Sequence, residues 1–130
     1  MNIFYGTERR FKVDENYSQM KHIGKFIGQM RKKYPDVPFK ALGYELDGDT
    51  MAYSLGMLNV RPDINEKITE VKLPDGGWED FSCPFNDKGI QGLYDRIWAD
   101  GALDYEIETI DGDVFEVSVH RAPSTPRPQR

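Results

Sequence analysis

The sequence has few of the features that mark several common protein classes. Its single cysteine, Cys83, excludes an intramolecular disulfide and favours a reducing compartment. No apolar run approaches the ~20 residues that a membrane-spanning helix needs, and the N-terminus lacks the pattern of a secretory signal peptide. These absences predict a cytoplasmic protein without a membrane partner.

Metal, cofactor and nucleophile chemistry also lack support. The two histidines, His22 and His120, have no zinc-type spacing to each other or to Cys83, so we expect both at the surface. The Asp-Gly-Asp phrases at 47–49 and 111–113 lack the rest of a calcium-binding loop. Cys83 has no base nearby in the sequence, and there is no glycine-rich phosphate loop. We therefore expect no metal, no cofactor and no catalytic residue of these types.

The charge balance is acidic, with a formal net charge of −5. Sequence-independent DNA binding depends on clustered Lys and Arg. The one basic run, 31–33, lies at the end of a predicted helix, where it complements the helix dipole. We expect no direct nucleic-acid binding, and the acidity is compatible with a cationic ligand.

Apolar periodicity predicts two amphipathic helices. The first spans 17–34 and ends at Pro35. Its stripe consists of Met20, Ile23, Ile27, Met30 and Tyr34, and Phe26 widens it. The second begins at an N-cap formed by Asn86 and Asp87 and ends at Gly101. Its stripe consists of Ile90, Leu93, Tyr94, Ile97 and Trp98.

Segments with strand-like alternation surround these helices. They cover 2–13, 39–46, 51–60, 66–73, 78–85, 105–109 and 114–120. Helices over antiparallel sheets place the chain in the α+β class. The proline-containing tail, 122–130, has little to bury, and we expect it to be disordered.

We predict that 39–46 forms a hairpin with 51–60 and that 105–109 forms another with 114–120, and these two hairpins share a phrase at an offset of 64 positions. The shared residues are Asp47, Gly48, Asp49 and Ser54 in the first and Asp111, Gly112, Asp113 and Ser118 in the second. We interpret the chain as one domain, 1–121, made of two pseudo-repeated β-α-β-β halves, about 1–61 and 62–121. Chance recurrence of common Asp-Gly turns is the alternative. Two such halves, joined edge to edge, predict a ligand groove between them.

With this doubled order and three local phrases, the chain resembles the GyrI-like family. This fold is shared by effector-binding domains of multidrug-sensing and AraC-type regulators and by stand-alone gyrase-inhibitor proteins. The phrases are Leu73-Pro74-Asp75-Gly76-Gly77-Trp78, the helix from Ile90 to Trp98, and Asp104-Tyr105-Glu106-Ile107. The resemblance covers residues 2 to about 121.

The resemblance implies a role for Glu106, because ligand-binding members have a glutamate there that faces a cationic, lipophilic ligand. Glu108 stands where the family has a second aromatic residue. Two carboxylates at i and i+2 lie on one face of a strand. Either the second carboxylate strengthens the preference of the site for cationic ligands, or this face of the strand is exposed to solvent. Equally, Glu106 is either a pocket acid or an exposed strand residue.

Aromatic side chains are available to surround such a ligand and add cation–π attraction. The candidates are Tyr5, Tyr53, Trp78, Phe81, Tyr94, Trp98 and Tyr105. Tyr94 and Trp98 lie on the stripe of the second helix, which favours core packing for those two. Trp78 follows a glycine-rich turn and is the better candidate for a pocket wall.

We therefore expect a stand-alone small-molecule-binding protein, related to regulators of transcription, with a cationic aromatic or lipophilic ligand in an aromatic pocket around a carboxylate. One alternative is a hydrolase of electrophilic compounds, with Glu106 or Glu108 as general base; binding is favoured over catalysis. Another is a protein-interaction module, such as a gyrase or toxin antagonist, marked by an exposed apolar patch. A protein partner or a homodimer is compatible with each.

Overall fold

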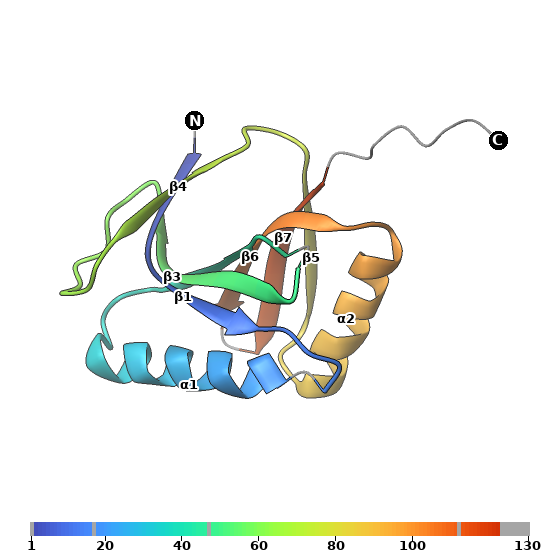
Figure 1. The fold of residues 1–130 in the computed structure, drawn as a ribbon. Helices are drawn as coiled ribbons and strands as arrows, with labels where there is room; N and C mark the ends of the chain where they lie inside the picture. Colours follow the sequence, from blue (N-terminus) through green and yellow to red (C-terminus); the bar gives the residue numbers. More distant parts are fainter. Residues whose placement is uncertain (1, 17, 47, 112, 123–130) are drawn as a thin grey trace.

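The computed structural model describes residues 2–16, 18–46, 48–111 and 113–122 (Figure 1). Most of the predicted tail lies outside these residues. The chain forms, in order, β1 (Asn2–Lys12), α1 (Ser18–Lys33), β2 (Lys40–Tyr44), β3 (Thr50–Leu58), β4 (Thr69–Leu73), β5 (Trp78–Pro84), α2 (Asp87–Ala99), β6 (Leu103–Asp111) and β7 (Val114–Arg121). The expected α+β class with two helices is confirmed.

All these strands belong to one antiparallel sheet in the order β4-β1-β3-β2-β6-β7-β5. The order β1-β3-β2 on one side matches the order β5-β7-β6 on the other, and each set contains one helix between its first and second strand. The two sets meet where β2 pairs with β6. β4 lies outside this scheme and pairs with β1.

Both helices cover the same face of the sheet. We name two groups of buried residues after the helix that each contains. The α1 cluster is Ile23, Phe26, Met30, Ala41, Met51, Tyr53 and Leu55, and the α2 cluster is Leu93, Ile97, Leu103, Phe115, Val117 and Val119. Ala41 pairs with Glu108, and Glu108 pairs with Val117. Because directly paired residues share a face, the two clusters lie side by side.

The sheet must curl, because residues 74–77 alone join its two edge strands, β4 and β5 (Figure 1). Seven flat strands would place the edges about 29 Å apart, whereas the link from Leu73 to Trp78 spans at most about 18 Å. The edges converge on the helix-free face, where Val71, Leu73 and Trp78 pack against one cluster with Phe4 and Ile107. The apolar side chains on this face are therefore buried because the sheet curls over them, and no described helix covers them.

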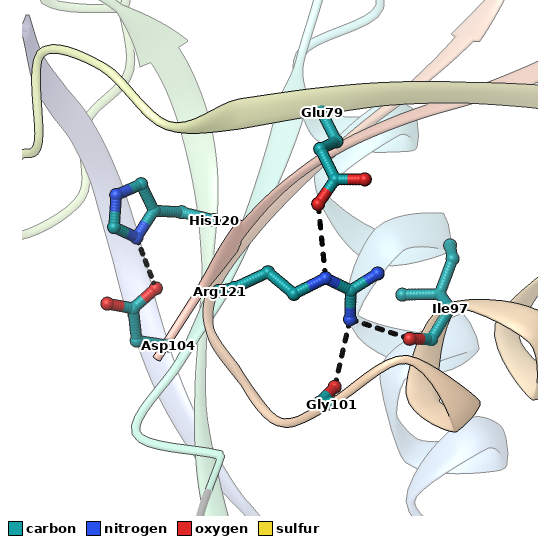
Figure 2. A network of polar contacts seen from close by, with 6 residues as sticks. All are labelled: Glu79, Ile97, Gly101, Asp104, His120 and Arg121. Carbon is teal, nitrogen blue, oxygen red and sulfur yellow. Dashed lines mark hydrogen bonds and ion pairs between the residues drawn. The ribbon is translucent and has the colours of Figure 1, made fainter. Parts of the chain in front are cut away.

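α2 is fixed at both ends. The Asn86 side chain caps it by accepting a hydrogen bond from the Gly89 amide at 2.7 Å, as the sequence predicts. At the other end, Figure 2 shows the Arg121 guanidinium donating to the carbonyl oxygens of Ile97 (2.7 Å) and Gly101 (2.9 Å). Helix C-termini leave such carbonyls without partners, so Arg121 joins β7 to the end of α2.

Replacing Arg121 with glutamine is expected to lower the free energy of unfolding by about 2 kcal/mol. The two hydrogen bonds that Arg121 donates to the carbonyl oxygens are charge-assisted and partly buried. Arg121 also forms an ion pair with Glu79, whose side chain is exposed, so this ion pair contributes little to the stability of the fold. Urea unfolding measures the loss. Arg96→Gln, an exposed cation of the same helix turn, is the matched control with a loss below about 1 kcal/mol. Equal losses in both variants would contradict the assignment.

Three sequence-based placements are wrong. His120 is not a surface residue: its ring packs on Trp78 and its Nδ1 lies 2.7 Å from an Asp104 carboxylate oxygen (Figure 2). Met20 is 57% exposed, because the buried face of α1 is rotated to Gln19, Ile23, Phe26 and Met30. Trp98 is 42% exposed, because Leu93 and Ile97 form the buried face of α2.

Neither described helix combines the length and the apolarity required to cross a membrane.

Candidate functional site

The candidate site lies at the junction of β2 and β6, where the two sets of strands meet. Glu106 and Glu108 of β6 pair with Gly43 and Ala41 of β2. On the other side of β6 they pair with residues of the α2 cluster. Both glutamates therefore lie on the helix-covered face, between the α1 cluster and the α2 cluster. Glu106 is only 7% exposed, so it is a buried acid rather than a solvated one.

Gly43 makes room for Glu106. A Cβ atom at Gly43 would lie 2.8 Å from the Glu106 Oε1 atom and 3.0 Å from its Cγ atom. A glycine inside a strand commonly marks such a close approach. The glutamate side chain therefore folds down onto the β2 backbone and stays beneath the helices. Sequence reasoning missed Gly43, although its position within an apolar strand was a usable signal.

Two tyrosines from opposite sides of the junction hold Glu108. Tyr53, on β3, donates to Oε1 at 2.8 Å, and Tyr94, on α2, donates to Oε2 at 2.5 Å. Burial, followed by the charges of the two glutamates, raises the pKa of each hydroxyl well above its usual value. Both phenols therefore keep their protons and remain donors. One carboxylate thus links the first set of strands to the second helix.

The electrostatics of the pair favour a proton. Burial and the charge of Glu108 raise the pKa of Glu106 to about 8, partly opposed by the Tyr94 hydroxyl. Burial also raises the pKa of Glu108, opposed by its hydrogen bonds from Tyr94 and Tyr53. Two buried carboxylates side by side do not both ionise readily. Near neutral pH the pair holds at least part of a proton.

An unpaired charge in a poorly solvated site is costly, so the negative charge of Glu106 and Glu108 has to be neutralised. Either a proton or a bound cation can neutralise it. A metal ion is a poorer fit, because the described residues contain no group of three or more His, Cys, Asp or Glu side chains that could hold one. The phenol rings offer faces and hydroxyls instead of further anionic ligands. The arrangement is chemically suited to an organic cation or to proton exchange.

The structure brings together four of the eight predicted site residues: Tyr53, Tyr94, Glu106 and Glu108. Phe81 shares the helix-covered face but packs against the α2 cluster. Trp98 points away from the core of the sheet, as its exposure shows.

Trp78 and Tyr105 lie on the helix-free face and point away from the glutamates, so Trp78, which the sequence favoured as a pocket wall, does not line the site. Tyr105 stacks on Tyr44 with ring centroids 6.1 Å apart, and Trp78 packs on Tyr105 at 6.5 Å. The Trp78 indole also donates to the Pro74 carbonyl at 2.9 Å. These rings hold the β4–β5 link against the curled face of the sheet.

No protein-family model, no curated protein and no solved structure matches this chain. Membership of the GyrI-like family therefore stays a prediction from the sequence.

Proposed function

We propose that this protein binds a small organic cation with an aromatic or lipophilic body, and that the charge of that cation is neutralised by Glu106 and Glu108. The observation that carries the proposal is the buried Glu106 next to the half-buried Glu108, which accepts hydrogen bonds from the Tyr53 and Tyr94 phenols at the junction of the sheet. The proposal includes a ligand groove at this junction and the relationship to GyrI-like effector-binding domains.

The composition of the site supports an organic rather than an inorganic cation. Tyr53 and Tyr94 present aromatic surface next to the acids, and each ring adds about 0.5–2 kcal/mol of cation–π attraction when desolvated. The flanking α1 and α2 clusters provide apolar walls. Because Glu106 is covered, a ligand reaches it only after side chains of α1 or α2 move aside.

The matching strand orders support the interpretation of two repeated halves. In that interpretation, the pairing of β2 with β6 is the contact between the halves, and the acids lie next to it. A site at such a junction can gain affinity from both halves, because ligand pockets occur preferentially where structural units meet.

The test is a fluorescence titration with N-methylacridinium, an aromatic cation whose charge does not depend on pH. Glu106→Gln is expected to weaken binding at least tenfold, or by about 1.4 kcal/mol, because the amide keeps the shape and removes the charge. The matched control is Glu116→Gln, which removes the same charge from an exposed position of β7. Binding in the control should stay within twofold of wild type, and equal weakening in both variants would overturn the proposal.

A second candidate is a hydrolase of electrophilic compounds, favoured by one observation. A carboxyl group with a pKa of about 8 exchanges protons near neutral pH, as a general acid or base must. This candidate requires multiple turnovers of an electrophilic probe such as an epoxide, whereas the binding protein only sequesters its ligand. Turnover that disappears in Glu106→Gln would favour the hydrolase.

A further inference from the structure

A second feature of the molecule is a surface pocket at the C-terminal end of α1. It has a volume of about 440 Å³, within the 300–1,000 Å³ typical of small-molecule sites. Its walls come from the last turn of α1, the segment 34–39 and the adjoining ends of β2 and β6. Thr109 is the β6 contribution, so the pocket reaches across the junction of the two strand sets.

The aromatic wall of this pocket is already fixed. The rings of Tyr34 and Phe39 meet edge to face with centroids 6.3 Å apart. The Tyr34 hydroxyl donates to Glu66 at 2.5 Å and accepts from the Asn65 amide at 3.0 Å. Pro35, which lies between the two rings in the chain, restricts the backbone of the segment. A flat ligand therefore meets a preformed surface and loses little affinity to ordering.

The charged side chains that line the pocket are both cations, Arg31 and Lys40. Within the described part of the chain, neither has an ion-pair partner. The neighbouring acid, Glu66, is occupied by Lys33 at 2.8 Å and by the Tyr34 hydroxyl. In a chain with a net charge of −5, two cations that lack an ion-pair partner among the described residues and share one concavity form a local anion-attracting site.

We propose that this pocket binds a small aromatic anion, whose anionic group lies between Arg31 and Lys40 and whose ring packs on Tyr34 and Phe39. The guanidinium is suited to a planar carboxylate and forms paired hydrogen bonds with it. The ammonium group of Lys40 supplies a second positive charge from β2. This site has the opposite charge preference to Glu106 and Glu108, and it does not depend on the proposed function.

The probe is 2-naphthoate, titrated by calorimetry and followed by the backbone amide NMR signals of Phe39 and Thr109. The double variant Arg31→Gln/Lys40→Gln is expected to bind at least tenfold more weakly. The matched control is Lys25→Gln/Lys32→Gln, which removes two exposed cations of α1 that do not line the pocket. It should bind within twofold of wild type. The uncharged analogue 2-naphthamide should bind wild type at least tenfold more weakly than 2-naphthoate.

Several results would overturn this proposal: no measurable binding of 2-naphthoate to wild type, equal binding of the amide, or equal weakening in the control. Unchanged thermal unfolding of both double variants separates a lost site from a lost fold. Glu106→Gln should leave 2-naphthoate binding within twofold of wild type. Failure here and failure of the cation site are therefore distinguishable, because each probe responds to its own variant.

Discussion

Gly56→Ala is expected to destabilise the protein by about 3–5 kcal/mol, or to prevent folding. Gly56 of β3 pairs with Gly6 of β1. An added Cβ atom would overlap the Tyr5 carbonyl oxygen and lie 2.5 Å from the Gly6 Cα atom. Both obstacles are backbone atoms in the middle of a paired strand, so neither can rotate away. The substitution must separate β1 from β3.

Urea unfolding, followed by tryptophan fluorescence, measures this effect. Gly24→Ala is the matched control, because Gly24 lies on the exposed face of α1 with nothing within 4 Å of an added Cβ. Alanine is expected to stabilise that helix position by about 0.5–1 kcal/mol. The same chemical change should therefore have opposite signs at the two sites. A loss below 1 kcal/mol at Gly56 would show that the strands pack less closely there.

The stability of the unliganded protein is expected to fall as pH rises from about 5 to about 8. The pKa of Glu106 is raised to about 8 in the folded protein, because of burial and the charge of Glu108. In the unfolded chain it returns to the ordinary value of 4.5. Between these values the folded state binds more protons, so the free energy of unfolding decreases by up to about 1.4 kcal/mol per pH unit for one proton.

Urea unfolding at a series of pH values tests this slope. In Glu106→Gln the slope should be smaller, because only Glu108 is left to titrate in the pair. The variant should also be more stable than wild type at pH 8, since the amide avoids the cost of a buried charge. The exposed control Glu116→Gln should keep the wild-type slope. Stability that rises with pH over this range would show that Glu106 is solvated or already paired.

The secondary structure was largely predictable because local signals carry it. The apolar stripes, Pro35 and the Asn86 cap predicted α1 and α2 to within a few residues of their observed ends. Strand-like alternation over 114–120 predicted β7, whose buried face consists of Phe115, Val117 and Val119. These signals depend on periodicity and capping, which the sequence contains directly.

The rotation of α1 was less predictable. The stripe that began at Met20 suggested a buried methionine, yet Gln19 is buried instead, with its side-chain oxygen unpaired within the described part of the chain. The predicted and observed faces share Ile23 and Met30, so a rotation of about 50°, half the angle between successive residues of a helix, exchanges Met20 for Gln19. Tertiary packing of Phe26 and Ile23 against the sheet decides between them, and a single sequence has no record of that contact.

The candidate site was predictable only in part, for a similar reason. Period-2 alternation placed Glu106 and Glu108 on one face, but it did not say which face the helices cover. The pairing of β2 with β6 decides that question, and it joins residues far apart in the chain. The short link before Trp78 decides where that indole lies, because it pulls β5 toward β4 on the helix-free face. The pairing of β2 with β6 and the approach of β5 to β4 are both properties of the whole sheet, which local sequence patterns do not contain.

The most direct test of the central claim is the affinity for N-methylacridinium between pH 6 and pH 9. If the cation replaces the proton held by Glu106, the wild-type association constant should rise by up to tenfold per pH unit below pH 8 and level off above it. In Glu106→Gln the affinity should be weak, with a smaller pH dependence. An association constant that changes neither with pH nor with this substitution would contradict the assignment of Glu106 and Glu108 as the cation site.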